Sequence, residues 1–131
     1  MENMGIRRIF DEDYEAVLAR VPGALSTEGF GVLTEIDVKA TLKKKLDVDF
    51  RRYKILGACN PPFAHKVLSA ELEIGLLLPC NVLVYETDEG KTVVSAIDPI
   101  AMMASAGDAS PEIAAVAEEV RAKLVAAVDK I

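Results

Sequence analysis

The stretch over residues 74–85 is the most apolar part of the chain, and it restricts the possible folds more than any other segment. Apolar residues occupy both sets of alternating positions, and only Gly75, Pro79, Cys80 and Asn81 interrupt them. Successive side chains of a strand point to opposite faces of its sheet, so this strand would be apolar on both faces. We therefore expect residues 74–85 to form a central strand, covered on both faces or covered on one face with a partner subunit on the other.

Four shorter segments are typical of further strands. They cover residues 6–10, 30–36, 53–59 and 92–97. Asp88-Glu89-Gly90 predicts a tight hairpin turn before the last of them, because glycine readily supplies the positive φ of such a turn. Together with residues 74–85, these segments predict a sheet of about five strands.

Capping residues mark where helices should begin. Asp11, Asp37 and Ser110 suit the N-cap position, and Pro61-Pro62 suits the first turn of another helix. Pro22-Gly23 interrupts the first helix, so we expect it to end or kink near residue 21. A small-residue connector is expected over residues 102–108, and a long amphipathic helix over about residues 110–131. The predicted fold is one α+β domain over residues 1–131, with helices packed on one face of the sheet.

Length and composition predict a cytoplasmic protein without a membrane segment. The chain has 131 residues, of which about half are apolar and about a quarter are charged, and this suits one globular domain. No apolar run reaches the roughly 18 residues that span a bilayer, and the first residues lack the apolar core of a secretory signal. Two cysteines in such a domain are expected to be reduced thiols of the cytoplasm.

The charge argues against a nucleic-acid-binding protein. The net charge is −6, whereas a nucleic-acid binder needs a basic surface to neutralise phosphates. Residues 39–54 carry seven basic and two acidic side chains, a charge of +5, so the remainder carries −11. We interpret this basic segment as a solvated face, with a local anion site as the alternative.

The two cysteines and the single histidine are the candidates for thiol or soft-ligand chemistry. Each cysteine is followed by asparagine and lies near proline, at Cys59-Asn60 and Cys80-Asn81, and His65 lies between the two pairs. Thiolate and imidazole suit zinc, copper(I) or haem iron, but spacings of 6 and 21 residues match no standard zinc motif, so Cys59, His65 and Cys80 are weak metal candidates. Each residue also has a structural interpretation, because cysteines often pack as small apolar residues and asparagines satisfy turn backbones.

The direction of the two strands that carry the cysteines decides whether their sulfur atoms can meet. If the strands are antiparallel neighbours, the end of the first lies beside the start of the second, and Cys59, His65 and Cys80 converge. If a helical crossover makes the strands parallel, the cysteines lie at opposite ends of the sheet, more than about 10 Å apart. The residue pattern by itself leaves both arrangements open.

Three segments of the chain resemble domain-of-unknown-function family 302, in the same order. They are residues 29–37 (GFGVLTEID), 54–65 (KILGACNPPFAH) and 75–82 (GLLLPCNV). The resemblance covers about residues 6–103 and implies a two-layer prokaryotic domain of TATA-binding-protein-like arrangement, with a curved, mainly antiparallel sheet. It also implies homodimers and favours the antiparallel cysteine strands, but it implies no reaction. The break at Pro22-Gly23 departs from the family pattern, and the helix over residues 110–131 extends beyond the shared region.

Three functions fit these observations. The first is a domain that binds a small ligand at a site centred on Cys59, Asn60, His65, Cys80 and Asn81, with no assigned reaction or cofactor. The second is a thiol redox or persulfide-handling protein, which needs a thiolate of lowered pKa. The third is a structural homodimer without chemistry, whose interface buries the central strand and the C-terminal helix. We favour the first function, and the sequence leaves open whether the protein is an enzyme.

Overall fold

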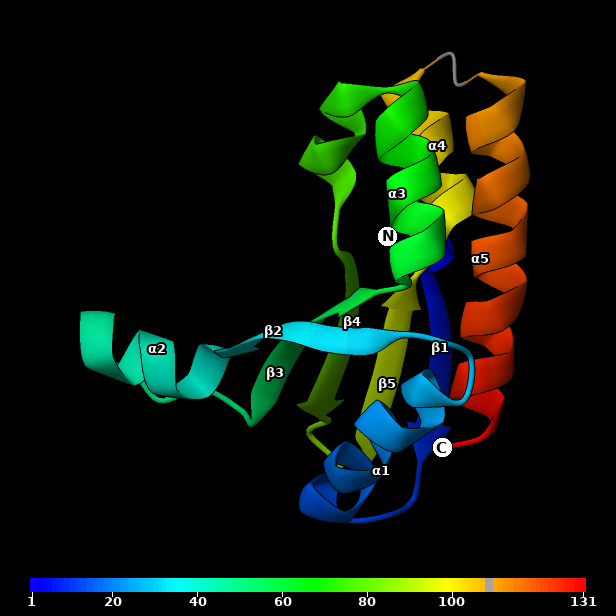
Figure 1. Ribbon diagram of the computed structural model, residues 1–131. Coiled ribbons are helices and arrows are strands. Elements are labelled where there is room, and N and C mark those ends of the chain that lie inside the picture. The colour runs from blue at the N-terminus through cyan, green and yellow to red at the C-terminus, as the bar shows by residue number, and fades with distance from the viewer. Residues whose placement is uncertain (108–109) are drawn as a thin grey trace.

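The computed structural model describes residues 1–107 and 110–131. Within these residues, one antiparallel sheet contains five strands in the order β1-β5-β4-β3-β2 (Figure 1). The strands are β1 (Gly5–Phe10), β2 (Gly31–Asp37), β3 (Tyr53–Cys59), β4 (Cys80–Glu86) and β5 (Thr92–Ile97). The helices are α1 (Tyr14–Ser26), α2 (Val38–Leu46), α3 (Pro61–Ala70), α4 (Pro99–Ala106) and α5 (Pro111–Asp129), with short 3-10 helices η1 (Glu2–Met4) and η2 (Leu72–Leu77). The arrangement confirms the expected α+β class and the expected number of strands.

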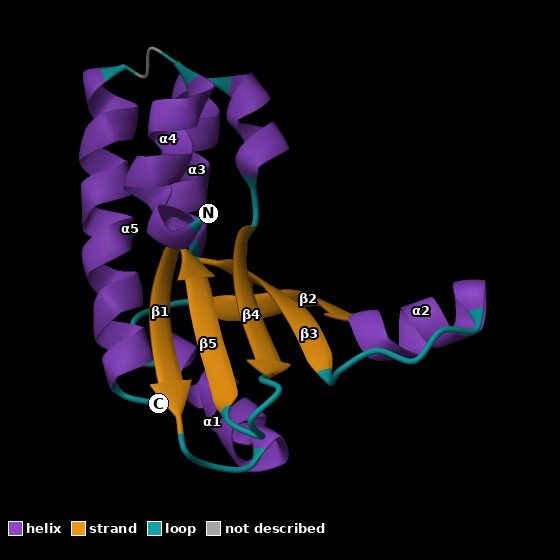
Figure 2. Ribbon diagram, turned by 180° about the vertical axis from the view of Figure 1, so that it is seen from behind, coloured by secondary structure: helices purple, strands orange, loops and turns teal. Residues whose placement is uncertain are grey.

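Helices cover one face of the sheet and leave the other face open, as Figures 1 and 2 show from opposite sides. α1 and α5 pack against the covered face, where Val82, Val84 and Val94 are buried. Strand alternation directs Leu83 and Tyr85 to the open face, where both remain partly exposed. The central strand β4 is therefore covered by the chain's own helices on one face only.

The first helix differs from the sequence prediction at both ends. Its N-cap is Asp13, whose carboxylate accepts a hydrogen bond from the Glu15 amide at 3.1 Å, and not Asp11. The helix also continues through Pro22 to Ser26, so an end near residue 21 is wrong, whereas the alternative of a kink there stays a prediction. The apolar side of α1 is fully buried on both sides of the proline, and this burial outweighs the cost of about 3 kcal/mol that proline imposes on a helix interior.

The apolar stretch over residues 74–85 is not one strand. Its first part belongs to η2, and β4 begins only at Cys80. In η2, Ile74 is buried whereas Leu72 and Leu76 are more than 80 % exposed, so this part has a one-sided burial pattern. A continuous apolar run does not distinguish a buried strand from a short helix followed by a strand, which is why the prediction failed here.

The predicted connector over residues 102–108 is also wrong in its first part, because α4 extends to Ala106; residues 108–109 lie outside the described residues. Asp98 caps α4 by accepting hydrogen bonds from the Ile100 and Ala101 amides, and its other oxygen accepts from Arg121 Nε on α5 at 2.9 Å. Partial burial raises the pKa of Asp98, but the bonds from Arg121 and the two amides outweigh it and lower the pKa overall. This ionised carboxylate joins the start of α4 to α5.

The C-terminal helix is held at its other end by the first strand. Arg8 on β1 donates from Nη1 to the backbone oxygens of Val128 and Asp129, both at 3.1 Å, and its guanidinium stacks on Phe10. A cation at a helix C-terminus also opposes the negative end of the helix dipole. Both ends of α5 are thereby fixed over the sheet. No helix among the described residues is long and apolar enough to cross a membrane.

Candidate functional site

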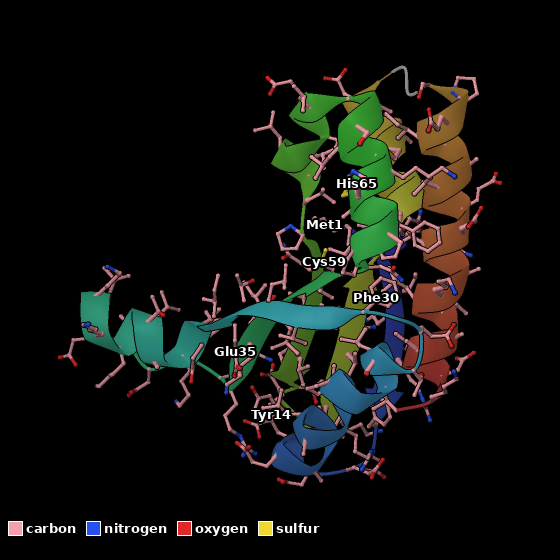
Figure 3. All side chains as sticks on the ribbon, viewed as in Figure 1. Met1, Tyr14, Phe30, Glu35, Cys59 and His65 are labelled. Atoms are coloured by element: carbon pink, nitrogen blue, oxygen red, sulfur yellow. The ribbon has the colours of Figure 1, made fainter. Side chains whose placement is uncertain are left out.

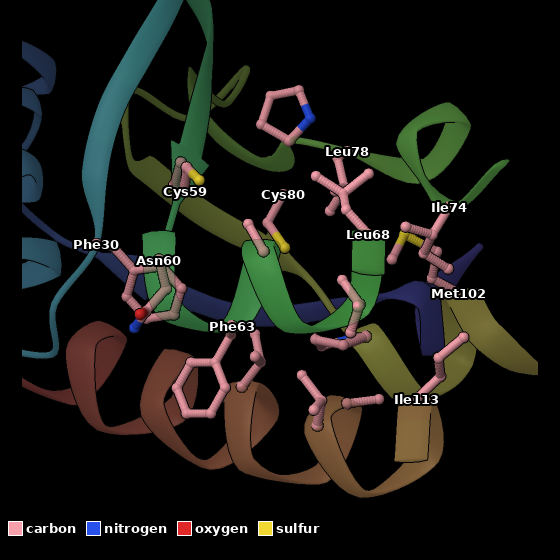
Figure 4. Close-up of a pocket in the computed structure, with 18 of the residues that line it drawn as sticks. Phe30, Cys59, Asn60, Phe63, Leu68, Ile74, Leu78, Cys80, Met102 and Ile113 are labelled. Carbon is pink, nitrogen blue, oxygen red and sulfur yellow. The ribbon is translucent and has the colours of Figure 1, made fainter. Parts of the chain in front are cut away.

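A cavity of about 300 Å³ lies between the ends of β3 and β4 and the helical layer formed by α3, η2, α4 and α5 (Figure 4). We call it the cysteine-lined pocket. Its lining residues come from seven elements and from the segments that join them. They are Phe30, Leu33, Ala58, Cys59, Asn60, Phe63, Ala64, Val67, Leu68, Ile74, Leu78, Pro79, Cys80, Pro99, Met102, Met103, Ile113, Val116, Ala117 and Val120.

The wall of the cysteine-lined pocket is almost entirely apolar. Seventeen of its twenty residues have only hydrocarbon or thioether side chains, and none is charged. The three exceptions are two thiols and one amide, those of Cys59, Cys80 and Asn60. Such a wall favours apolar ligand atoms, because a charge placed there would lose its hydration without gaining a partner.

The sheet brings the two cysteines to this pocket. β3 and β4 are antiparallel neighbours, which confirms the first of the two arrangements considered, and Ala58 pairs with Cys80. Cys59, the last residue of β3, therefore lies at the same end of the sheet as Cys80, the first residue of β4. Cys80 is buried and Cys59 is partly exposed, so only one of the two thiols is accessible to water.

The surroundings of Cys80 make its thiol a weaker acid than an ordinary cysteine. Burial is the main cause, and together with repulsion by a charge on nearby Cys59 it raises the pKa of Cys80 to about 11. Cys80 is consequently a neutral thiol near pH 7, since its thiolate would have to form in an apolar wall. A neutral thiol is a weak hydrogen-bond donor and a poor nucleophile.

Asn60 is the polar residue of the pocket and is 8 % exposed. Its Nδ2 donates to the backbone oxygen of Glu28 at 3.1 Å, which attaches the start of α3 to the turn between α1 and β2. Gly29 occupies that turn with a φ of +85°, and a Cβ there would lie 3.1 Å from Asn60 Nδ2. Although Asn60 is the N-cap residue of α3, its side chain makes no capping hydrogen bond. The residues after it are Pro61 and Pro62, which have no N–H group to donate.

His65 and Asn81 do not line the cysteine-lined pocket. His65 is exposed on α3, whereas Cys59 lies at the end of β3 (Figure 3). Asn81 is exposed on the open face of the sheet, where it borders a different and more polar pocket with Arg7, Leu83 and other residues. Among the residues that the structure describes, no three histidine, cysteine or acidic side chains are grouped as metal ligands. The structure thus brings together three of the five predicted residues.

Most of the wall was not identified from the sequence. α5 contributes Ile113, Val116, Ala117 and Val120, and α4 contributes Met102 and Met103. The amphipathic pattern of α5 shows that this side is buried, but the same pattern would arise if it packed without a cavity. Whether buried side chains leave a space depends on tertiary packing, which single-sequence patterns do not encode.

Comparisons with known proteins place the chain in a family. Residues 7–131 match the family model described as domain of unknown function DUF302, so the C-terminal helix lies within the shared region, contrary to the sequence prediction. A solved structure, the crystal structure of uncharacterized conserved protein DUF302 from Bacillus stearothermophilus, is similar over 97 % of each chain, with 29 % identity and a TM-score of 0.87. No curated protein matches the chain. The chain therefore belongs to the DUF302 family.

Proposed function

We propose that this protein binds a small apolar molecule in the cysteine-lined pocket, with no reaction assigned. The observation that carries the proposal is a cavity of about 300 Å³ in a domain of only 131 residues. Small-molecule sites are concave and mostly apolar, and this pocket, which is partly open to solvent, has both properties. A small ligand of apolar character would fill this space and restore the missing contacts.

The thiol redox alternative has weaker support. It needs a thiolate near neutral pH, but burial keeps Cys80 protonated. It would also gain from an imidazole beside the thiols, and His65 does not line the pocket. We therefore assign the cysteines to the wall of a binding site, where thiols act as small apolar groups.

The binding proposal can be tested with a small neutral fluorescent probe such as naphthalene. Ala117 on α5 lines the pocket, and Ala114 on the same helix is exposed. Ala117→Leu places extra methyl groups in the cavity and should weaken probe binding by about tenfold or more, because the ligand loses that space. Ala114→Leu is the matched control, with the same substitution and helix, and should bind as the wild type does. Equal binding by both variants would contradict the proposal.

A homodimer is the second proposal, and an excess of exposed surface favours it. The accessible surface is 7608 Å², whereas a compact monomer of 14.1 kDa exposes about 6,700 Å². The excess of roughly 900 Å² is close to the ~800 Å² that each partner buries in an interface of standard size.

The excess surface has a clear location. α2 extends away from the body of the molecule (Figure 1) and contains no buried residue. The last residue of α2 and the segment after it expose three apolar side chains, Leu46, Val48 and Phe50, at 66 %, 43 % and 39 %. We call residues 38–50 the arm. Its basic side chains suit contact with a second copy, whose residues outside 39–54 carry a charge of −11.

We also infer a cytoplasmic location and no binding to nucleic acid. Two unpaired cysteines suit a reducing compartment. The net charge of −6 opposes association with phosphate backbones.

A further inference from the structure

The dimensions of the cysteine-lined pocket limit the size of its ligand. A water molecule occupies about 30 Å³ of liquid, and a methylene group is of similar size, so 300 Å³ accommodates about ten non-hydrogen atoms. A molecule of this size is a medium-length alkyl chain or a single substituted ring. Nucleotides and peptides are much larger.

The wall also limits the charge of the ligand. Among the described residues, no lysine, arginine, histidine, aspartate or glutamate side chain lines the pocket. A carboxylate or ammonium group inside it would lose its hydration with no ion partner, at a cost of several kcal/mol. The part of the ligand that enters the pocket is therefore neutral.

Asn60 Oδ1 is a polar atom of the wall that remains available to a ligand. The Asn60 side chain makes a hydrogen bond to the backbone oxygen of Glu28. A carbonyl oxygen can only accept, so the Asn60 atom in this bond is the donor Nδ2, and the remaining amide atom is Oδ1. Among the described residues, none donates a hydrogen bond to this oxygen, and the side chain does not cap α3.

This oxygen also retains accessible surface in a residue that lines the pocket. Every fully buried side-chain nitrogen or oxygen among the described residues has a hydrogen-bond partner. Asn60 Oδ1 has none, so it retains some accessible surface, although the residue as a whole is 8 % exposed and lines the cavity. Figure 4 shows Asn60 beside Phe30 and Phe63 at one side of the pocket. A fixed acceptor in an apolar wall selects ligands with a matching donor.

We infer that the ligand is a neutral, apolar molecule of about ten non-hydrogen atoms whose single O–H or N–H group donates to Asn60 Oδ1. The inference rests on the proposed function and specifies the ligand class. A medium-chain alcohol or an alkyl phenol has this chemistry. Its apolar part would extend along α5 and α4 toward Ile113 and Met102, and its donor would lie at the start of α3.

Three probes of nearly equal size test the inference by calorimetric titration. 1-Octanol has the donor, its isomer 1-methoxyheptane lacks it, and octanoate at pH 7 carries a charge. We expect 1-octanol to bind about tenfold more tightly than 1-methoxyheptane, because only the alcohol satisfies the Asn60 oxygen. Octanoate should bind at least about tenfold more weakly than 1-octanol, because its carboxylate has no partner in the wall. Adding 4-propylphenol distinguishes a ring from a chain as the apolar part.

Two variants locate the effect. Asn60→Leu should remove the preference for the alcohol over its isomeric ether, whereas Asn81→Leu, the same substitution at an exposed asparagine on the open face, should retain it. If Asn60→Leu does not fold, the affinities of the wild type for the alcohol and for the ether still show whether the ligand needs a hydrogen-bond donor. Equal affinity for these two probes, or octanoate binding as tightly as octanol, would overturn the inference on ligand class. Absence of binding by all the probes would instead overturn the proposed function.

Discussion

Cys59 and Cys80 line the same pocket, but reagents in solution can reach them to different extents. Cys59 is partly exposed at the end of β3, and Cys80 is 8 % exposed in the covered face of the sheet. Burial also raises the pKa of Cys80 to about 11, so few of its molecules are thiolates at neutral pH. The two thiols therefore have different chemical behaviour although they are near each other.

We predict that iodoacetamide at pH 7.5 modifies one cysteine quickly and the other only after unfolding. Cys59 should react first, because alkylation needs an accessible thiolate. Mass spectrometry of the digested protein measures the extent of modification at each site. In Cys59→Ser, the remaining thiol should react at the slow rate. Equal rates at the two sites in the folded wild type would show that Cys80 is not sealed in the wall.

Residue types singled out Cys59, Asn60 and Cys80, and all three line one pocket, because an antiparallel pair of strands brings their ends together. The same reasoning included His65 and Asn81, and the structure places both outside the pocket. Which side of α3 or β4 a residue occupies depends on how the element packs. Neighbouring residues of a strand point to opposite faces of the sheet, so Asn81 faces away from the pocket that Cys80 lines.

At the scale of elements, α2 is unusual because it forms without any buried side chain. Asp37 caps it by accepting from the Ala40 amide at 2.9 Å, and Lys43, Lys44 and Lys45 oppose the negative end of its dipole. Isolated helices shorter than about 12–15 residues are marginal in water, and α2 has only nine. Local signals thus predicted this helix correctly, and we propose that contacts with a second copy of the chain add to its stability.

We expect the arm to hold two copies together. The wild type should elute with a mass twice 14.1 kDa in size-exclusion chromatography with light scattering at micromolar concentration. Leu46→Asp combined with Val48→Asp should give a monomer, because two charges would be buried in the interface without partners. Leu72→Asp is the control, since Leu72 is an 82 % exposed apolar residue on η2, and it should remain dimeric. A monomeric wild type would contradict this prediction.

For the whole molecule, the sequence predicted the sheet and the helical layer better than the pocket between them. Alternation and caps gave five strands and helices on one side, because each of these signals acts within a few residues. The division of residues 74–85 between η2 and β4 was missed, although that division places Ile74 and Leu78 in the wall of the pocket. The cavity itself forms where seven elements meet and their side chains leave space between them, so no local sequence pattern predicts it.

Methyl NMR spectroscopy can test whether the cysteine-lined pocket binds a small apolar ligand. Titration of the wild type with 1-octanol should shift the methyl signals of Ala58, Val67 and Ala117, which line the pocket. The methyl signals of Ile55 and Leu83, on the open face, should not move. Saturable shifts confined to the first group would agree with the account. Shifts confined to the open face, or no saturable shifts at all, would contradict it.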